Sequence, residues 1–291
     1  NANINDFAIA QINYTVGDID NNIAKIITAI EIAKSQSAKI VVFSELAISG
    51  YNPRDLLTEP AFINKCLNAD EKIIQASQNI TVVWGNISRN TTGLGKELNN
   101  VACIASNGKL LGKAIKAHLP NFGVFGELRY FEPGPEETAT PVFTTYDGIN
   151  IMLSVCADIW AHPDLPWELA CTIIPHKYPD KLFQTDKSYD AIINISASPY
   201  VFEKPKNRVL MLTELSKNTG KLVVYANQVG ANNDTLFDGS SMGCLPNGDF
   251  VQLKSFHEEV TSLGKLSPQS SYPETCLQAE QYEAIAMGLR D

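Results

Sequence analysis

The chain has 291 residues, of which 44% are hydrophobic and 19% charged, so its composition is that of a globular protein with a substantial core. Its net charge of −9, from 23 basic and 32 acidic residues, argues against nucleic acid or an anionic membrane surface as the main partner. No apolar run reaches the roughly 18 residues of a membrane span, and residues 1–7 carry no signal-peptide pattern, so we expect a cytoplasmic protein.

The first third of the chain alternates predicted strands and helices. Short runs of branched and aromatic residues predict buried strands at residues 7–12, 39–43 and 80–84. One helix is predicted after Asp18 and Asp20, whose carboxylates are candidate N-caps, and a second over about residues 62–78. Strands separated by helices in this way are typical of a layered α/β architecture.

Two Asn-Gly dipeptides predict β-hairpins farther along the chain. Asn107-Gly108 is the dipeptide of a type I′ turn, and it joins predicted strands at residues 100–106 and 109–115. Asn247-Gly248 lies in a second predicted hairpin around residues 242–253. Both hairpins indicate that antiparallel strands extend the sheets that the first segments begin.

The second half of the chain supplies further sheet and one more helix. Additional strands are predicted at residues 149–155, 191–195 and 222–226. A helix is predicted over about residues 206–219, and Gly220 closes it as a C-terminal glycine. We therefore expect helices outside two stacked mixed sheets.

The C-terminal tail differs in character from the rest. Residues 267–274 (SPQSSYPE) have the composition of a polar linker, and residues 277–289 have a helical pattern. We interpret residues 1–266 as one domain and residues 267–291 as a linker and the truncated start of a further domain.

The six cysteines are scattered without CxxC pairs, which is typical of reduced cytosolic thiols rather than of a disulfide framework. They are Cys66, Cys103, Cys156, Cys171, Cys244 and Cys276. No cysteine or histidine pair has the spacing of zinc ligands, so no metal site is expected.

Three reactive side chains follow apolar strands. Glu45 comes after residues 41–43, Lys116 after residues 111–115, and Cys156 after residues 151–155. Ligands of layered α/β proteins collect at the carboxyl ends of strands, so these groups can converge there. Taken singly, each has a simpler interpretation as a capping carboxylate, a solvated lysine or a small buried thiol.

Together, Glu45, Lys116 and Cys156 suit the hydrolysis of an amide. A cysteine attacks as its thiolate, a carboxylate can take up its proton, and an ammonium can stabilise the oxyanion together with the backbone N–H of Ala157. By spacing alone, a Cys-His pair with His118 or His162 is an alternative.

This triad resembles the nitrilase, or carbon–nitrogen hydrolase, superfamily, in which glutamate, lysine and cysteine occur in this order. A finer similarity is to the glutaminase domain family of glutamine-dependent NAD synthetases. The segments that carry it are residues 43–57 (FSELAISGYNPRDLL), 116–131 (KAHLPNFGVFGELRYF), 156–160 (CADIW) and 194–199 (NISASP), with Lys204 and Arg208 beyond. The last eleven residues, QYEAIAMGLRD, resemble the opening of a synthetase domain.

The resemblance implies a four-layer αββα sandwich and a role for each site residue. It makes Glu45 the general base, Lys116 the oxyanion stabiliser, Cys156 the nucleophile and Glu127 an additional glutamate that orients the site. The glutamine pocket that it implies contains Tyr51, Phe122, Ala157, Ser198 and Arg208. Of these, Arg208 is suited to clamp the α-carboxylate of glutamine. The chain departs from the family pattern at Gly126, Ala157, Val201 and Glu203, where aspartate, glutamate, histidine and glycine are usual.

The reaction implied is hydrolysis of L-glutamine to glutamate and ammonia through a γ-glutamyl thioester on Cys156, without a cofactor or metal. The ammonia would pass to a C-terminal synthetase domain that uses ATP and Mg to make NAD, and we expect a homo-oligomer. Two alternatives are a stand-alone amidase or carbamoylase of the same superfamily and a catalytically silent scaffold domain. The intact triad favours an enzyme.

Overall fold

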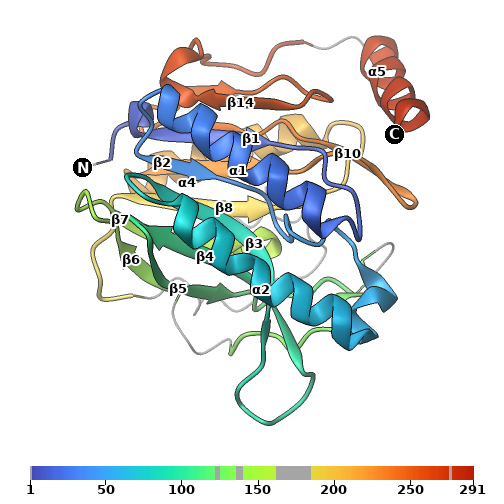
Figure 1. Cartoon of the computed structure of the whole chain (residues 1–291). Helices are drawn as coiled ribbons and strands as arrows, with labels where there is room; N and C mark the ends of the chain where they lie inside the picture. The colour runs from blue at the N-terminus through green and yellow to red at the C-terminus, as the bar shows by residue number, and fades with distance from the viewer. Residues whose placement is uncertain (1, 122–124, 136–139, 162–184, 275–276) are drawn as a thin grey trace.

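Two six-stranded sheets form the centre of the computed structural model, which describes residues 2–121, 125–135, 140–161, 185–274 and 277–291 (Figure 1). Helices cover the outer face of each sheet. The expected four-layer αββα sandwich is therefore confirmed.

The first sheet has the strand order β14-β1-β2-β3-β4-β5. Its strands are β1 (Phe7–Gln11), β2 (Ile40–Val42), β3 (Thr81–Arg89), β4 (Leu98–Ser106), β5 (Lys109–Ile115) and β14 (Glu259–Ser262). The strands β1, β2 and β3 are parallel, and the others are antiparallel to their neighbours. Helices α1 (Ile19–Ser35) and α2 (Pro60–Ala76) pack on the outer face.

The second sheet has the strand order β13-β12-β9-β8-β7-β6. Its strands are β6 (Val142–Thr144), β7 (Asn150–Val155), β8 (Ala191–Ser196), β9 (Leu222–Asn227), β12 (Met242–Cys244) and β13 (Phe250–Gln252). The central strands β7, β8 and β9 are parallel. Helix α4 (Lys204–Thr219) covers the outer face, and a separate two-stranded ribbon consists of β10 (Val229–Asn232) and β11 (Thr235–Asp238).

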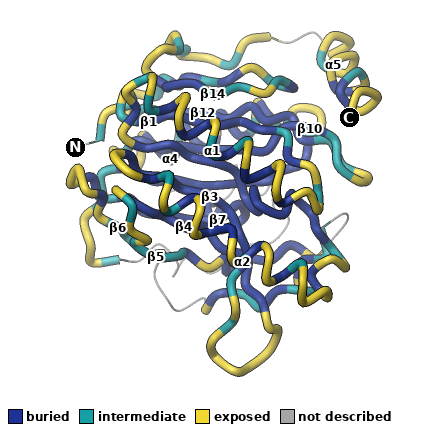
Figure 2. Tube along the Cα trace, in the orientation of Figure 1, coloured by how far each residue is buried: buried dark blue, intermediate teal, exposed yellow. Residues whose placement is uncertain are grey.

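Alternating side chains divide the core into layers. In β1, Phe7 and Ile9 point between the two sheets, whereas Ala8 and Ala10 pack toward the helices. Both faces of the central strands are consequently buried, and the outward faces of the helices carry the exposed residues (Figure 2). The continuous apolar runs from which strands were predicted reflect this two-sided burial.

Most predicted elements are present, with some differences at turns and short strands. Asn107 and Gly108 both have positive φ angles, of 50° and 77°, as the predicted type I′ turn requires. Asp18 caps α1 by accepting a hydrogen bond from the amide of Asn21, but Asp20 lies inside the helix, so its prediction as an N-cap was wrong. Strands β6, β10, β11 and β14, of three or four residues each, were not predicted.

The predicted C-terminal helix is α5 (Leu277–Arg290), which packs beside β10 and β11 (Figure 1). Its buried face consists of Ala284 and Met287. The opposite side exposes Tyr282, Ile285 and Leu289. Within the described ranges, no helix combines the length and apolar character needed to cross a bilayer.

Candidate active site

The three residues of the predicted triad follow strand ends in two different sheets. Glu45 lies three residues after β2 and Lys116 directly after β5, both in the first sheet, whereas Cys156 directly follows β7 of the second. The Nζ of Lys116 lies 2.6 Å from Oε1 of Glu45. The charges of both residues shift the pKa of the Cys156 thiol, so all three groups are within electrostatic reach of one another.

Glu45 is completely buried, and both of its carboxylate oxygens accept hydrogen bonds. Its Oε1 accepts from Lys116 and, at 2.7 Å, from the side-chain amide of Asn100. Its Oε2 accepts from the backbone amide of Ala197 at 3.0 Å. A buried carboxylate with this many donors is held in one orientation.

Lys116 bridges two buried carboxylates. Besides Glu45, its ammonium donates to both oxygens of Glu127 at 2.8 Å. Burial alone would lower the pKa of Lys116, but the negative charges of Glu127 and Glu45 raise it well above its ordinary value. The lysine is therefore a permanent cation in the site.

Glu127 is also held by Tyr51, whose hydroxyl donates to the same Oε1 atom as Lys116, at 2.6 Å. Burial raises the pKa of Glu127, and the ammonium of Lys116 and the hydroxyl of Tyr51 oppose this rise. The residue before it, Gly126, has a φ of 56°. This left-handed backbone suits glycine, which accounts physically for the departure from aspartate at this position.

Cys156 occupies a strained position at the end of β7, with a φ of 45° that non-glycine residues rarely adopt. The residue is 8% exposed. Burial raises the pKa of its thiol to about 12, the negative charge of Glu45 adds to this rise, and Lys116 and a hydrogen bond with Ser196 oppose it. The resting Cys156 is thus a neutral thiol, which would need a base to act as a nucleophile.

A buried amide holds the turn that carries the nucleophile. The Nδ2 of Asn194 donates to the carbonyl of Cys156 at 3.2 Å and to the hydroxyl of Ser154 at 3.0 Å. The hydroxyl of Ser196 donates to Oδ1 of Asn194 at 2.8 Å. Sequence reasoning gave neither Asn194 nor Ser196 a separate role, although both lie in the quoted segment NISASP.

The residues predicted to line a glutamine pocket have varied surroundings. The hydroxyl of Tyr51 is bonded to Glu127, and Ala157 is buried in the apolar cluster between the second sheet and α4. Ser198 is buried, and its backbone N–H donates to the side chain of Asn227 at 2.8 Å. Phe122 lies outside the described residues. The pocket roles of these residues stay predictions.

Arg208 is completely buried and is paired within the protein. Its two terminal nitrogens donate to the two carboxylate oxygens of Asp238 at 2.8 and 2.9 Å, and one of them also reaches the carbonyls of Ser198 and Pro199 at 3.3 Å. This fork geometry is the one that Arg208 was predicted to offer to a substrate carboxylate. The structure gives the guanidinium a carboxylate partner of its own.

Lys204, at the start of α4, is a half-buried cation on the same side of the site. Burial and the positive charge of Arg208 lower its pKa to about 8, and the charges of Cys156 and Asp238 act in the opposite direction. Within the described part of the chain, the side chain of Lys204 has no carboxylate within ion-pair distance. The sequence marked Lys204 only as part of the similarity.

The alternative histidine bases have no demonstrated contact with the thiol. His118 is buried, and its Nδ1 lies 4.0 Å from the carboxylate of Asp158. Burial and the positive charge of Lys116 lower the pKa of His118 to about 4. His162 lies outside the described residues.

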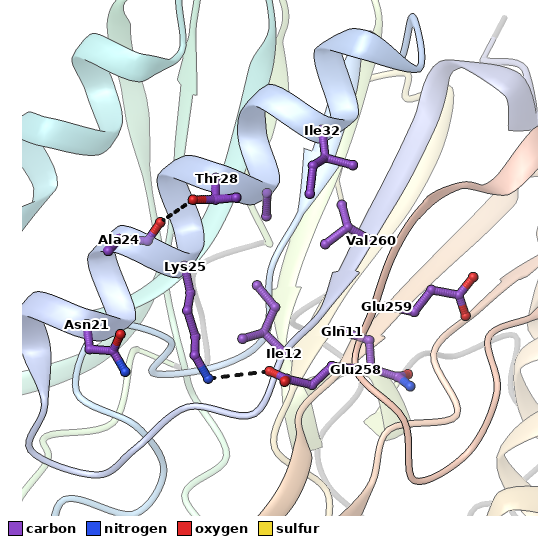
Figure 3. Close-up of a pocket in the computed structure, with 11 residues that line it drawn as sticks. Gln11, Ile12, Asn21, Ala24, Lys25, Thr28, Ile32, Glu258, Glu259 and Val260 are labelled. Atoms are coloured by element: carbon purple, nitrogen blue, oxygen red, sulfur yellow. Dashed lines mark hydrogen bonds and ion pairs between the residues drawn. The ribbon is translucent and has the colours of Figure 1, made fainter.

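A surface groove of about 480 Å³ between α1 and β14 contains none of these catalytic candidates (Figure 3). Figure 3 shows Lys25 of α1 reaching toward Glu258 across the groove, which Ile12 and Val260 also line. Among the described residues, no group of three or more histidine, cysteine and acidic side chains has the arrangement of a metal site.

This fold and this Glu-Lys-Cys arrangement define the class of carbon–nitrogen hydrolases. The carbon-nitrogen hydrolase family profile matches residues 7–165, and the chain belongs to this family. The chain is 33% identical over 291 residues to glutamine-dependent NAD(+) synthetase of Acinetobacter baylyi and 32% identical over 261 residues to that of Aquifex aeolicus. These alignments cover 98% and 89% of this chain but 49% and 42% of the relatives, so the chain spans about half their length.

Solved structures agree with this relationship. Glutamine-dependent NAD+ synthetase from Acinetobacter baumannii, in complex with ADP, superimposes with a TM-score of 0.80 and 31% identity, over 98% of this chain and 51% of that one. An amidase from Nesterenkonia sp. has a TM-score of 0.67 and 21% identity, over 87% of both chains. The second likeness shows the fold alone.

Proposed function

We propose that this chain is a glutaminase domain, which hydrolyses the side-chain amide of L-glutamine and supplies the ammonia to a synthetase domain. The observation that carries the proposal is the Lys116 ammonium held between Glu45 and Glu127 within electrostatic reach of the Cys156 thiol. The likeness to glutamine-dependent NAD(+) synthetases supports glutamine as the amide.

In the first half of the proposed reaction, the sulfur of Cys156 attacks the amide carbon while Glu45 takes the thiol proton. The C–N bond breaks, Glu45 returns the proton to the departing nitrogen, and ammonia leaves a γ-glutamyl thioester. The neutral resting thiol supports this order, because a carboxylate at hand can remove the proton as the C–S bond forms.

In the second half, water attacks the thioester carbon and Glu45 accepts a proton from that water. The C–S bond breaks, the sulfur regains a proton from Glu45, and glutamate leaves. Both tetrahedral intermediates carry a negative oxygen, which Lys116 and the backbone N–H of Ala157 would stabilise. Because Glu127 and Tyr51 hold the ammonium in place, little reorganisation is needed when the charge forms.

Lys204 is the better candidate for binding the α-carboxylate of glutamine. Arg208 already forms a two-point pair with Asp238, so its use by a substrate would break two buried charge-assisted bonds. Burial and the positive charge of Arg208 lower the pKa of Lys204, which is typical of a cation short of negative neighbours. A bound carboxylate would supply that missing charge.

The full-length relatives are about twice as long as this chain, which supports the presence of a further domain in the whole protein. Residues 267–291 would lead from the glutaminase domain into a synthetase domain that uses ATP and Mg, and the assembled protein would be a cytoplasmic homo-oligomer. No step proposed for the glutaminase reaction uses a metal or cofactor.

Ammonia release from glutamine, compared with release from simple aliphatic amides and carbamoyl compounds, tests the proposal. We expect glutamine to have the highest kcat/KM. Preference for a simple amide would indicate a stand-alone amidase, and no turnover of any amide together with an unreactive Cys156 would indicate a scaffold.

A further inference from the structure

Asp158 connects the segment that carries the nucleophile to the segment that carries the oxyanion lysine. Asp158 lies two residues after Cys156 in the short 3-10 helix Cys156–Ala161, and it is only 4% exposed. Its carboxylate accepts from the backbone amide of Ala117 at 3.2 Å for each oxygen, and from that of His118 at 2.8 Å. These two amides directly follow Lys116.

The three hydrogen bonds cross from one sheet to the other. Lys116 continues β5 of the first sheet, where its amide bonds to the carbonyl of Asn100, whereas Asp158 follows β7 of the second. The space between the sheets is filled mainly by apolar side chains, whose attraction has no preferred direction. The hydrogen bonds of Asp158 are directional, so they can fix the position of the Lys116 segment relative to the Cys156 segment, which the apolar contacts alone do not fix.

We infer that Asp158 is a positioning residue, which sets the place of the Lys116 ammonium relative to the Cys156 sulfur by binding the backbone that follows Lys116. Displacements of about 1 Å in such a pair reduce rates on the order of a hundredfold. The activity assay of this inference rests on the proposed function, whereas the hydrogen bonds of Asp158 do not.

The surroundings of Asp158 make its hydrogen bonds sensitive to its charge. Burial raises the pKa of Asp158 to about 7, the two backbone amides and Lys116 oppose the rise, and Glu45 adds to it. His118 faces the carboxylate at 4.0 Å, and Lys113 lines a cavity of about 180 Å³ that Asp158 also borders. The ionised form accepts from both amides, so protonation near neutral pH weakens the connection.

The first test is Asp158→Asn, which keeps the shape but replaces one acceptor oxygen by an NH2 group facing an amide. In ammonia release from glutamine, we expect kcat to fall about a hundredfold while KM changes less than about threefold. Because unfolded protein would also lower the apparent kcat without changing KM, kcat is calculated per active site, counted by labelling of Cys156 with a glutamine-analogue electrophile.

A matched control is Asp190→Asn. The Oδ2 of Asp190 accepts from the backbone amide of Asn150 at 2.9 Å, so it also ties a neighbouring backbone, but at the opposite end of β7 from Cys156. We expect this variant to keep kcat within about threefold of the unchanged chain. Unchanged kcat in Asp158→Asn, or an equal loss in Asp190→Asn, would overturn the inference.

A second measurement needs no substitution and no substrate. In protein labelled with ¹⁵N at alanine and histidine, the amide signals of Ala117 and His118 should shift together between pH 5.5 and 8.5, with a midpoint near the pKa of Asp158 of about 7. The His118 imidazole, whose pKa is about 4, titrates below this window. Amide signals of Ala117 and His118 that do not respond to protonation of Asp158 at any pH at which the protein is folded would overturn the inference, even if glutamine proves not to be the substrate.

Discussion

The backbone amide of Ala197 donates to Oε2 of Glu45 at 3.0 Å, which links the end of β8 in the second sheet to the end of β2 in the first. The two residues are 152 positions apart in the sequence. Since Lys116 and Asn100 donate to the other oxygen, the Glu45 carboxylate accepts hydrogen bonds from residues of both sheets. The active site is therefore a product of how the sheets are stacked.

Substitution of Cys156 by alanine should abolish ammonia release from glutamine, with a loss of at least about a thousandfold, because the thioester cannot form. Cys244→Ala is the matched control, since Cys244 is an equally buried thiol outside the proposed site. Turnover in Cys156→Ala at the level of this control would exclude Cys156 as the nucleophile.

A glutamine-analogue electrophile should label Cys156 and leave Cys66, Cys103 and Cys244 unmodified. Burial raises the pKa of all four thiols, but only Cys156 interacts with both the Lys116 cation and the Glu45 base. Peptide mass spectrometry after a short incubation measures the site, and modification that survives in Cys156→Ala would point to a different residue.

Glu45→Gln should leave the protein folded but reduce kcat by about a hundred to ten thousandfold, because general-base catalysis is lost. The amide can still accept from Lys116 and Asn100 through its oxygen, although its NH2 group then faces the amide of Ala197. The exposed residue Glu258 provides the control Glu258→Gln, for which we expect unchanged kcat. An active Glu45→Gln variant would mean that a residue other than Glu45 is the base.

Lys116→Met should destabilise the fold by about 3–5 kcal/mol in denaturant unfolding, because it leaves two buried carboxylates without their cation. Adding Glu127→Gln should recover part of this stability, since one of the unpaired charges is then removed, but no activity. Equal stability of the single and double variants would show that the carboxylates are not coupled through Lys116.

Lys204→Met should raise the KM for glutamine about tenfold at pH 7 with a smaller change in kcat, if Lys204 binds the α-carboxylate. With a lowered pKa of about 8, Lys204 is charged below pH 8 and loses its charge above it. The KM of the unchanged chain should therefore rise between pH 7 and 9, more steeply than that of Lys204→Met. Lys206→Met, on the exposed side of α4, should match the unchanged chain at every pH.

Glu203→Gly should raise the free energy of unfolding by about 1 kcal/mol, because Glu203 has a left-handed φ of 63° that favours glycine. Glu203→Ala keeps the unfavourable backbone geometry and should give no gain. Thermal unfolding of the two variants checks this, and a higher midpoint for Glu203→Ala would contradict the explanation.

The fold was predictable from the sequence, and so was the position of each triad candidate at a strand end, because these signals are local. Buried strands appear as apolar runs, and Glu45, Lys116 and Cys156 each stand where such a run ends. The segments around them also resemble known glutaminase domains. The strand-end positions and the resemblance both suggested that Lys116 and Glu45 could meet, and the structure places Nζ of Lys116 2.6 Å from Oε1 of Glu45.

The supporting residues were not predictable, because their contribution depends on distant partners. Nothing in the residue type of Asn100 or Ala197 marks it as a partner of Glu45. Yet the side chain of Asn100 and the backbone amide of Ala197 both donate to the Glu45 carboxylate. Arg208 has the right chemistry for a substrate carboxylate, but its partner Asp238 lies 30 residues later, on a strand too short to predict. Periodicity carries no information about such pairings.

Helix α5 has a consequence for any study of assembly. Tyr282, Ile285 and Leu289 are 71%, 62% and 84% exposed on a helix that is anchored by its opposite side. Exposed apolar side chains of this kind associate with other exposed apolar surfaces, including the same helix of a neighbouring molecule. We expect Ile285→Ser to reduce any self-association of this chain that uses this helix face, as measured by sedimentation or light scattering, without touching the sheets.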